Sequence, residues 1–579
     1  MNMKLILLVF TVNISYCLVT CEQITLRTKL GNITGVERNI SDNKLLEFRK
    51  IPYAKAPVGD LRFEKPVPYG SWTSPLDATT YSPSCYQELP ENVKNVLANK
   101  IVTEDCLFLN IYVPFTVTPK TPKSVMVWIH GGGYSTGQAA LYDPGRFATT
   151  GDVIVVTINY RLNVFGFLST TDLNGNYGIW DQILAIQWVK NNIDSFGGNS
   201  DSITIFGESA GAFSVGLLSI APRNDGLFKR AIMQSGVAIS PYSMGKKANS
   251  SLVSQFLNCT HNDENLVSCL KKKTSPELYE GLLKSKFAQQ ALLEIQFAPV
   301  VDGELFLDNP LKLLNDVDSP ASQFYRSLDV IIGTTSGESS LFVFTLQKLQ
   351  ILFQFNVSDG IPKRVLTNFL APQIANAYFN GNPRVIAAII KQYGQSNDRM
   401  RQTFDILDLY TDLLFFVPAV HSLLLHDPNN AKKSRQFQYV FHGLPSFPLF
   451  GPLPPWFNRS EHAADTTYQF GNSFVSLPTL DTDLSNKFIK YWANFAKTGD
   501  VNDADLPMWK EHDAVQAHYI NLDVNITTGQ HLFQDRVQFW LNDIQQFQNP
   551  TSSGTCLRQI TIGWLIFVSF MFSPVFFYH

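Results

Sequence analysis

The sequence has little net charge and no run of like charges, and these absences exclude several classes of partner. The 46 lysines and arginines nearly balance 49 aspartates and glutamates, so the formal net charge of the 579 residues is −3. Because no basic stripe is present either, the composition gives no support to a nucleic-acid partner. No internal repeat stands out, and no linker is long enough to mark a second domain. We therefore expect residues 22–550 to form one domain, as long α/β chains often do.

Nucleotide-binding glycine patterns are also missing. The run Gly131-Gly132-Gly133 is not followed by Gly-Lys-Ser or Gly-Lys-Thr, and its spacing differs from that of dinucleotide sites. Hydrophobic residues make up 45% of the chain and charged residues 16%, which is ordinary for a globular protein with a large core.

The N-terminus carries an apolar run that is too short to cross a membrane. Residues 5–10 are apolar, Lys4 precedes them, and residues 15–21 are small or semi-polar. This order predicts a secretory signal peptide over residues 1–21, cleaved between Cys17 and Cys21. A buried N-terminal strand is the alternative interpretation.

The C-terminus ends in a longer apolar stretch. Residues 552–559 are mostly small or polar, and residues 560–578 carry no charge. Segment 551–579 is therefore similar to a GPI-attachment signal, whose tail is removed. A retained transmembrane segment and a buried helix are the alternatives; no lysine or arginine follows the stretch to lie in the cytoplasm. The two ends together predict an extracellular protein, either secreted or anchored to the outer face of the plasma membrane.

Cysteines are few, and their positions fit an oxidising compartment. Loss of both terminal segments removes three of the seven cysteines and leaves four, in two pairs close in sequence. Such pairs would form disulfides that close short loops, Cys85–Cys106 and Cys259–Cys269, each worth about 3 kcal/mol. Several Asn-X-Ser/Thr sequons also fit a glycosylated secreted chain. They lie at Asn32, Asn39, Asn249, Asn258, Asn356, Asn458 and Asn525.

Short apolar runs alternate with segments of helical periodicity. An alternating stretch over residues 24–35 predicts an opening hairpin, and residues 176–196 and 210–220 predict helices. Runs that are apolar throughout and alternate with helices indicate a mostly parallel sheet. These strands are predicted at residues 124–130, 152–159, 201–206, 228–234 and 328–333. Residues 249–470 are helix-rich and irregular, and we expect them to form insertions over the sheet.

The strand at residues 201–206 runs directly into Gly207-Glu208-Ser209-Ala210-Gly211. Gly-x-Ser-x-Gly between a strand and a helix predicts a sharp turn that exposes the serine hydroxyl. The helix N-terminus behind it would stabilise negative charge. The pattern therefore predicts Ser209 as a nucleophile; a structural turn serine is the alternative.

The glycine run after the strand at residues 124–130 is predicted to contribute to the same catalytic site as Ser209. Backbone N–H groups of Gly132 and Gly133, together with that of Ala210, are predicted to form an oxyanion hole. Each such donor contributes about 3 kcal/mol to the transition state. Glycine is needed because a side chain would keep the backbone away from a substrate oxygen.

Four longer motifs extend this pattern. They are Glu-Asp-Cys-Leu-Phe-Leu-Asn (104–110), Asn-Tyr-Arg (159–161) with Phe-Gly-Phe-Leu (165–168), Gly-Asn-Tyr-Gly (175–178) through Asp181-Gln182, and Phe-Gly-Glu-Ser-Ala-Gly (206–211). In these motifs the chain resembles the type-B carboxylesterase and cholinesterase family, and the resemblance extends from about Gly35 to Trp540. It implies an α/β-hydrolase fold, with a mostly parallel central sheet flanked by helices and helical insertions over an active-site gorge.

The resemblance also implies a triad in the chain order serine, acid, histidine. Glu338, after the strand at residues 328–333, corresponds to the acid and would orient the imidazole. His462 matches the base better than His442 does, because an acidic residue and an aromatic-x-Phe-Gly sequence follow it. His442 is expected at a strand end near the surface. The family's glycine after the histidine is Ala463 here, which is similar to the bile-salt-activated lipase branch.

Other residues match structural features of the family. Arg62 with Glu104, and Arg161 with Asp181, are similar to its buried ion pairs, which are costly to break one partner at a time. A third, C-terminal disulfide of cholinesterases is absent, because Val537 stands in place of its cysteine.

The residues expected to face the substrate differ from those of acetylcholine-specific relatives. The Cys85–Cys106 loop contains no tryptophan to hold a quaternary ammonium by cation–π contact, and Leu341 replaces an aromatic residue that also helps to hold choline. Aliphatic residues in the acyl pocket favour acyl groups larger than acetyl. The resemblance puts this pocket at Tyr242, Leu293, Ile295 and Phe342.

The resemblance therefore implies a general carboxylesterase that acts on small-molecule carboxylic esters through an acyl-enzyme, with no metal and no cofactor. A homo-oligomer is compatible with this function. Two other functions remain open. One is a cell-surface, cholinesterase-like adhesion protein, although inactive relatives lack a nucleophile or base that this chain retains. The other is a lipase of the bile-salt-activated type, which Ala463 alone favours.

Overall fold

The computed structural model describes nine stretches of the chain. They are residues 22–89, 94, 99–118, 120–259, 265–283, 295–426, 434–444, 453–471 and 479–548. The predicted signal peptide, the predicted anchor signal and the acyl-pocket residue Leu293 lie outside the described residues.

One sheet organises the described chain and confirms the predicted fold class. It is 13-stranded, with parallel central strands from β9 to β14 and antiparallel strands at both ends. The predicted opening hairpin is formed by β1 and β2. The strands lie in the order β1 (Gln23–Thr28), β2 (Gly31–Ile40), β3 (Asn43–Pro52), β7 (Phe108–Pro114), β9 (Ile154–Ile158), β8 (Lys123–Ile129), β10 (Gly198–Glu208), β11 (Arg230–Gln234), β12 (Asp329–Thr335), β13 (Gln436–Phe441), β14 (His518–Leu522) and β15 (Thr527–Gln530), with β4 (Leu76–Asp77) beside β2.

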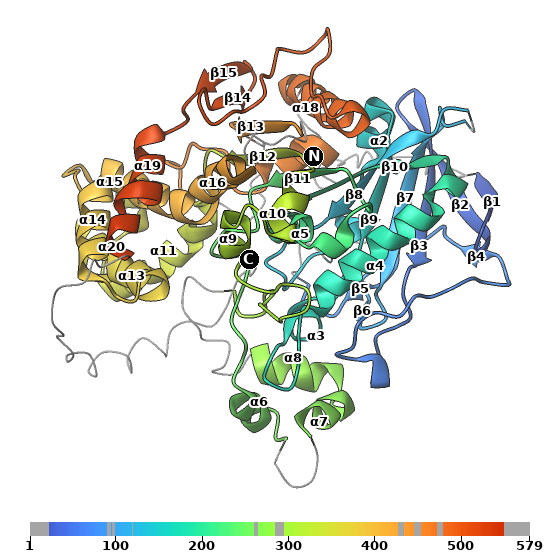
Figure 1. The fold of residues 1–579 in the computed structure, drawn as a ribbon, viewed down its shortest axis with the longest axis horizontal. Coiled ribbons are helices and arrows are strands. Elements are labelled where there is room, and N and C mark those ends of the chain that lie inside the picture. Colours follow the sequence, from blue (N-terminus) through green and yellow to red (C-terminus); the bar gives the residue numbers. More distant parts are fainter. Residues whose placement is uncertain are drawn as a thin grey trace, which may run out of the picture.

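Side chains of the central strands alternate between two apolar cores, one on each face of the sheet. In β8, for example, Val127 joins one core and Trp128 joins the other. A helical layer covers each face, so the central strands are buried on both sides, as their apolar runs predict. Helices α4 (Tyr177–Asn192) and α5 (Ala210–Ser219) cover one face, and α2 (Gly145–Gly151), α17 (Ala464–Phe470) and α18 (Thr479–Thr498) cover the other (Figure 1).

A group of helices is inserted between β12 and β13 and gathers at one end of the molecule, in yellow and orange in Figure 1. It includes α11 (Ser340–Phe353), α13 (Ala371–Tyr378), α14 (Pro383–Tyr393), α15 (Arg399–Thr411), the π-helical turn η8 (Asp412–Phe416) and α16 (Val417–His426). The continuous stretch Arg399–His426 is long and apolar enough to cross a membrane, but 89% of its most apolar part is buried in the protein. We therefore assign it to the core.

Both predicted disulfides are present, and an ion pair links the regions that they close. The bonds are Cys85–Cys106 and Cys259–Cys269. Arg62 donates to both carboxylate oxygens of Glu104, at 2.7 and 2.6 Å. The same guanidinium donates to three carbonyl oxygens around the end of α7 (Leu266–Lys272). It therefore holds the first disulfide loop against the helix that carries the second disulfide.

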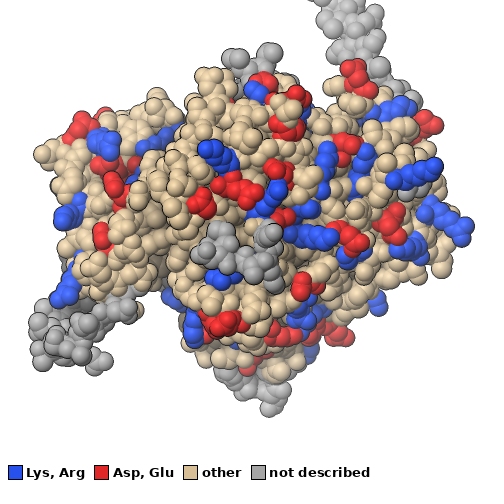
Figure 2. All heavy atoms as spheres, turned by 45° about the horizontal axis from the view of Figure 1, so that its top comes forward, with Lys and Arg blue, Asp and Glu red and all other residues tan. Residues whose placement is uncertain are grey.

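Charged side chains are mixed on the surface and paired in the interior. Figure 2 shows blue and red side chains interspersed over one face, in keeping with the small net charge. In the interior, the predicted pair Arg161–Asp181 is buried, and the guanidinium donates two hydrogen bonds of 2.7 Å to the carboxylate. Loss of one partner would leave an uncompensated buried charge.

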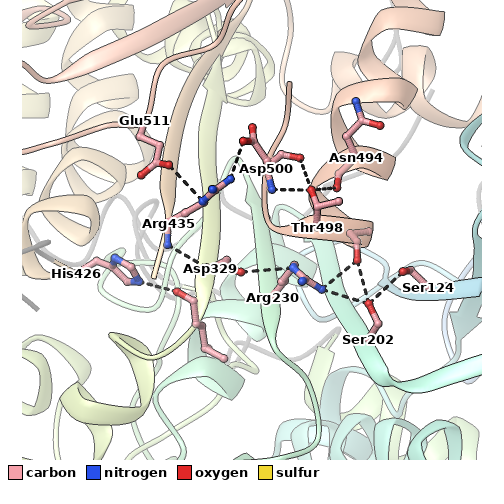
Figure 3. Close-up of polar contacts among 12 residues, drawn as sticks. Ser124, Ser202, Arg230, Asp329, His426, Arg435, Asn494, Thr498, Asp500 and Glu511 are labelled. Carbon is pink, nitrogen blue, oxygen red and sulfur yellow. Dashed lines mark hydrogen bonds and ion pairs between the residues drawn. The ribbon is translucent and has the colours of Figure 1, made fainter. Parts of the chain in front are cut away.

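The amino ends of the parallel strands carry a separate polar network, at the edge of the sheet opposite to Ser209 (Figure 3). Asp329, which begins β12, pairs with Arg230 of β11 and accepts the backbone N–H of Arg435 at 2.9 Å. Arg435 in turn pairs with Asp500 and Glu511. Each charge in this network faces an opposite charge, so we assign it a role in holding the strand ends together.

Candidate active site

Ser209 lies at the junction between β10 and α5. The strand ends at Glu208, the helix begins at Ala210, and Ser209 has φ 54° and ψ −123°, a conformation that L-residues rarely adopt. Its N–H donates to the carbonyl oxygen of Gln234 at 2.9 Å, which holds the turn against β11. Backbone strain of this kind costs about 1–3 kcal/mol and is concentrated at functional sites.

Close backbone contacts require the two glycines that flank the serine. A Cβ on Gly207 would lie 2.6 Å from the backbone of Gly211, and a Cβ on Gly211 would lie 2.0 Å from the carbonyl oxygen of Ile129. No larger residue would let β8, β10 and α5 meet here. The resulting turn leaves Ser209 half-buried, whereas both neighbouring residues are fully buried.

The glycine loop after β8 lies beside this serine. A Cβ on Gly131 would come within 3.1 Å of the Cβ of Ser209. Gly132 and Gly133 have φ of +104° and +59°, and a Cβ on Gly133 would meet nothing within 4 Å. Gly133 therefore borders open space two residues after Gly131, the glycine that packs on Ser209, and a substrate oxygen can approach its backbone there. These two glycines, with Ala210, are the predicted oxyanion-hole residues.

The structure brings Glu338 and His462 together, although 124 positions separate them in the sequence. One oxygen of the Glu338 carboxylate hydrogen-bonds to Nδ1 of His462, and the other accepts the N–H of Thr335 at 2.7 Å. The backbone N–H of His462 donates to the Ser340 hydroxyl at 2.9 Å. In the neutral imidazole Nδ1 then carries the proton, and Nε2 is the nitrogen able to accept one.

His442, the alternative candidate, lies elsewhere. It directly follows β13, is half-buried, and its Nε2 lies 3.2 Å from Oδ1 of Asn521 on β14. Its backbone N–H also donates to the carbonyl oxygen of Leu522 at 2.8 Å. Both contacts join β13 to β14, so His442 occupies the strand-end position that the sequence predicted for it.

A second carboxylate touches the imidazole. Oε1 of Glu208 lies 3.0 Å from Nε2 of His462. Burial alone would lower the pKa of the His462 imidazole, but the charges of Glu208 and Glu338 outweigh this effect and raise the pKa to about 10. Burial also raises the pKa of Glu208. Glu208 and His462 interact strongly, so their titrations are coupled. This contact was not predicted, because the sequence marks Glu208 only by its place in the pentapeptide.

Asp465, three residues after the histidine, adds a third buried carboxylate. Its Oδ2 accepts hydrogen bonds from the hydroxyl of Tyr439 at 2.8 Å and from the amide of Gln234 at 3.0 Å. Burial and, secondly, the charge of Glu208 raise the pKa of Asp465 to about 7. The sequence marked this residue only as the acid that follows the histidine, because β11 and β13, which supply its partners, are remote in the chain.

An aromatic cluster borders the imidazole. The ring of Phe415, in η8, lies 5.1 Å from the ring of His462. Two predicted acyl-pocket residues, Tyr242 and Phe342, belong to the same apolar core, with ring centroids 6.4 Å apart, and Ile295 packs against it. Phe415 comes from a helix that carries no motif, so no local signal in the sequence marked it.

All seven asparagines of the predicted glycosylation sites are exposed, so attachment of a glycan requires no unfolding. These are Asn32, Asn39, Asn249, Asn258, Asn356, Asn458 and Asn525.

Known proteins resemble this chain over nearly its whole length. The family model described as "Carboxylesterase family" matches residues 22–540. The chain belongs to the carboxylesterase family. Carboxylesterase 5A of Mus musculus is 35% identical to it over 545 residues, which cover 89% of this chain and 88% of that protein.

Two further relatives show the breadth of this family of carboxylesterases. Acetylcholinesterase of Bungarus fasciatus is 32% identical over 563 residues, covering 92% of this chain and 88% of that protein. Pyrethroid hydrolase Ces2e of Rattus norvegicus is 32% identical over 546 residues, covering 90% and 89% respectively. These matches identify this carboxylesterase as a carboxylic ester hydrolase and confirm the predicted family and fold.

Proposed function

We propose that this carboxylesterase hydrolyses small esters through an acyl-enzyme on Ser209, with Glu338 and His462 completing a triad. Nε2 of His462 accepts the proton of the Ser209 hydroxyl while the serine oxygen attacks the ester carbonyl. Backbone N–H groups of the glycine loop and of Ala210 hold the oxyanion. His462 then gives its proton to the departing alcohol, which leaves an ester bond between the acyl group and Ser209.

The second half-reaction releases the acid. His462 removes a proton from a water molecule, and the hydroxide attacks the acyl carbonyl. The bond to Ser209 then breaks, and the serine oxygen regains the proton from the imidazole. In both halves the carboxylate of Glu338 stabilises the imidazolium that forms.

One observation carries this proposal: the imidazole that bonds to Glu338 also lies 3.0 Å from Glu208, the residue next to Ser209 in the strained turn. The acid fixes the protonated Nδ1 and directs Nε2 towards proton transfer. Open space beside Gly133 admits an ester carbonyl. A serine with only a structural role would need neither the strained backbone nor the buried acid–base pair.

Several features support a general carboxylesterase rather than an acetylcholine-specific one. The Cys85–Cys106 loop has no tryptophan, and Leu341 stands where an aromatic residue would help to hold choline. An acyl pocket with Ile295 leaves room for acyl groups larger than acetyl. A lipase of the bile-salt-activated type is favoured only by Ala463, and a preference for emulsified long-chain esters would identify it.

We also propose that the protein is secreted, N-glycosylated and held at the outer face of the plasma membrane by a C-terminal anchor. Two disulfides and seven exposed sequon asparagines support an oxidising, glycosylating route. Phospholipase treatment that releases the protein from intact cells would identify a GPI anchor, whereas a retained transmembrane segment resists it.

The full-length protein, expressed in a secretory host, tests the catalytic proposal with 4-nitrophenyl butyrate as substrate. We expect Ser209→Ala to lower kcat/KM by about 10⁴-fold or more and to abolish labelling by a fluorophosphonate. Ser219→Ala is the matched control, because this serine lies on the helix that follows Ser209 and its hydroxyl donates to the carbonyl oxygen of Val215. A folded wild type that neither hydrolyses the ester nor reacts with the fluorophosphonate contradicts the proposal and favours the adhesion hypothesis.

A further inference from the structure

The aromatic cluster beside the triad contains a buried hydroxyl without a partner. Tyr410, in α15, is 1% exposed, and its Oη has no hydrogen-bond partner among the described residues. A buried hydroxyl left unsatisfied costs about 1–3 kcal/mol, so such groups nearly always find a partner. Tyr325, which is equally buried, donates to the carbonyl oxygen of Ser422 at 3.2 Å. Because no described residue satisfies the hydroxyl of Tyr410, this hydroxyl is available to bond a bound molecule.

The ring of Tyr410 packs on a residue of the predicted acyl pocket. It stacks on Phe342 with ring centroids 4.3 Å apart, and Phe342 lies 6.4 Å from Tyr242. Phe342 is two residues after Ser340, whose hydroxyl accepts the backbone N–H of His462. The helix that fixes the position of the histidine thus also carries the ring on which Tyr410 stacks.

A second contact ties the helix of Tyr410 to the nucleophile. The hydroxyl of Ser240 donates to the carbonyl oxygen of Leu414, in η8, at 2.6 Å. Ser240 belongs to the loop after β11, and in this loop a Cβ on Gly236 would lie 2.8 Å from the carbonyl oxygen of Ser209. The helical segment that carries Tyr410 therefore contacts, through its continuation in η8, the loop packed on Ser209.

We infer that Tyr410 determines specificity for the acyl group, by donating its hydroxyl hydrogen to an oxygen that the acyl chain carries. This inference rests on the proposed function and names its substrate class: esters whose acyl group holds an ether, keto or hydroxyl oxygen beyond the ester carbonyl. Apolar rings around Tyr410 accommodate the carbon atoms of the chain, and the hydroxyl selects the position of the oxygen. A purely hydrocarbon chain leaves that hydroxyl unsatisfied, and a site built to bond an oxygen discriminates against such a chain.

Matched esters test this inference on the full-length protein. The probes are 4-nitrophenyl hexanoate and its 3-oxa, 4-oxa and 5-oxa isosteres, in which one methylene is replaced by oxygen. We expect Tyr410→Phe to lower kcat/KM for one oxa isomer by about tenfold relative to its effect on the hexanoate. Tyr325→Phe, which removes a buried hydroxyl from the same core, should change all four esters alike. Each ester is compared between variants, so differences in intrinsic reactivity cancel.

The outcomes separate this inference from the proposed function. If Tyr410→Phe affects all four esters equally, or none, the inference is wrong while hydrolysis through Ser209 stands. If the wild type hydrolyses none of them and does not react with a fluorophosphonate, the proposed function fails and the inference fails with it. If Tyr410→Phe does not fold, the inference is tested on the wild-type protein alone. Its kcat/KM for each ester is divided by the rate of hydroxide-catalysed hydrolysis, and a ratio no higher for any oxa isomer than for the hexanoate overturns the inference.

Discussion

Glutamine in place of Glu208 would remove one of the two negative charges that hold a proton on His462, with little change in size. Oε1 of Glu208 lies 3.0 Å from Nε2 of the imidazole, and Glu338 remains on the other nitrogen. A general base must be neutral to accept the proton of Ser209, so a high imidazole pKa suppresses activity on the acid side. Loss of the Glu208 charge lowers that pKa. The acid limb of kcat/KM therefore moves to lower pH.

The distance between the two groups sets the size of this shift. Two unit charges 3.0 Å apart interact by about 5.5 kcal/mol at an effective dielectric constant of about 20, which corresponds to about 4 pKa units. This figure is an upper bound, because burial raises the pKa of Glu208 and so disfavours its charged form. Opposite charges at this range typically shift a pKa by about 1–3 units. We expect the acid limb to move by about that amount.

The measurement is kcat/KM for 4-nitrophenyl butyrate between about pH 4 and pH 10, which reports ionisations of the free enzyme. Asp465→Asn is the matched control, because it removes a carboxylate of the same cluster that bonds to Tyr439 and Gln234. The acid limb of Asp465→Asn should shift less than the acid limb of Glu208→Gln. An acid limb that stays in place in Glu208→Gln, or moves to higher pH, would refute the electrostatic account of this site.

Three further substitutions have expected outcomes. Gly133→Ala should lower kcat for butyrate hydrolysis by about 10²–10³-fold, because its Cβ enters the open space that borders the glycine loop; unchanged kcat would exclude this glycine from the oxyanion site. Ala463→Gly should raise the free energy of unfolding by about 0.5–1 kcal/mol, because Ala463 has φ 65°; urea unfolding measures this, and a lower midpoint contradicts it. Arg161→Met should lower the free energy of unfolding by about 3–5 kcal/mol, because it leaves Asp181 charged and buried. Adding Asp181→Leu should recover part of that loss, and a double variant less stable than the single one would argue against the ion pair as its cause.

Local sequence signals predicted the elements around Ser209 because those elements are shaped by neighbouring residues. The runs at residues 124–130 and 201–206 became β8 and β10, and the pentapeptide became the turn between β10 and α5. The predicted helix at residues 176–196 proved shorter, since α4 ends at Asn192 and a 3₁₀ turn, Ile193–Phe196, leads into Gly197 at φ +79°. Helical periodicity does not distinguish the last α-helical turn from such a 3₁₀ extension.

Long-range contacts were predicted only where the resemblance to a family supplied them. Glu338 and His462 were proposed as partners from motif order, since nothing in either segment reports the distance between them. Phe415 and Tyr410 were not predicted, because in the sequence each is one apolar position of a helical segment. Their contacts form only when that segment packs on the loop after β11. The contact between Glu208 and His462 was also missed, because the two residues are remote in the chain.

The strained backbone conformation of Ser209 serves catalysis and lowers the stability of the fold. Glycine adopts φ 54° and ψ −123° without strain, so a glycine at this position would yield a more stable protein without hydrolase activity. If such a chain served only for adhesion, selection would not preserve the nucleophile. Replacement of the serine by glycine would then be neutral for function and favourable for stability. Loss of activity by this route would stabilise the fold. Retaining serine at this position therefore costs about 1–3 kcal/mol of folding free energy.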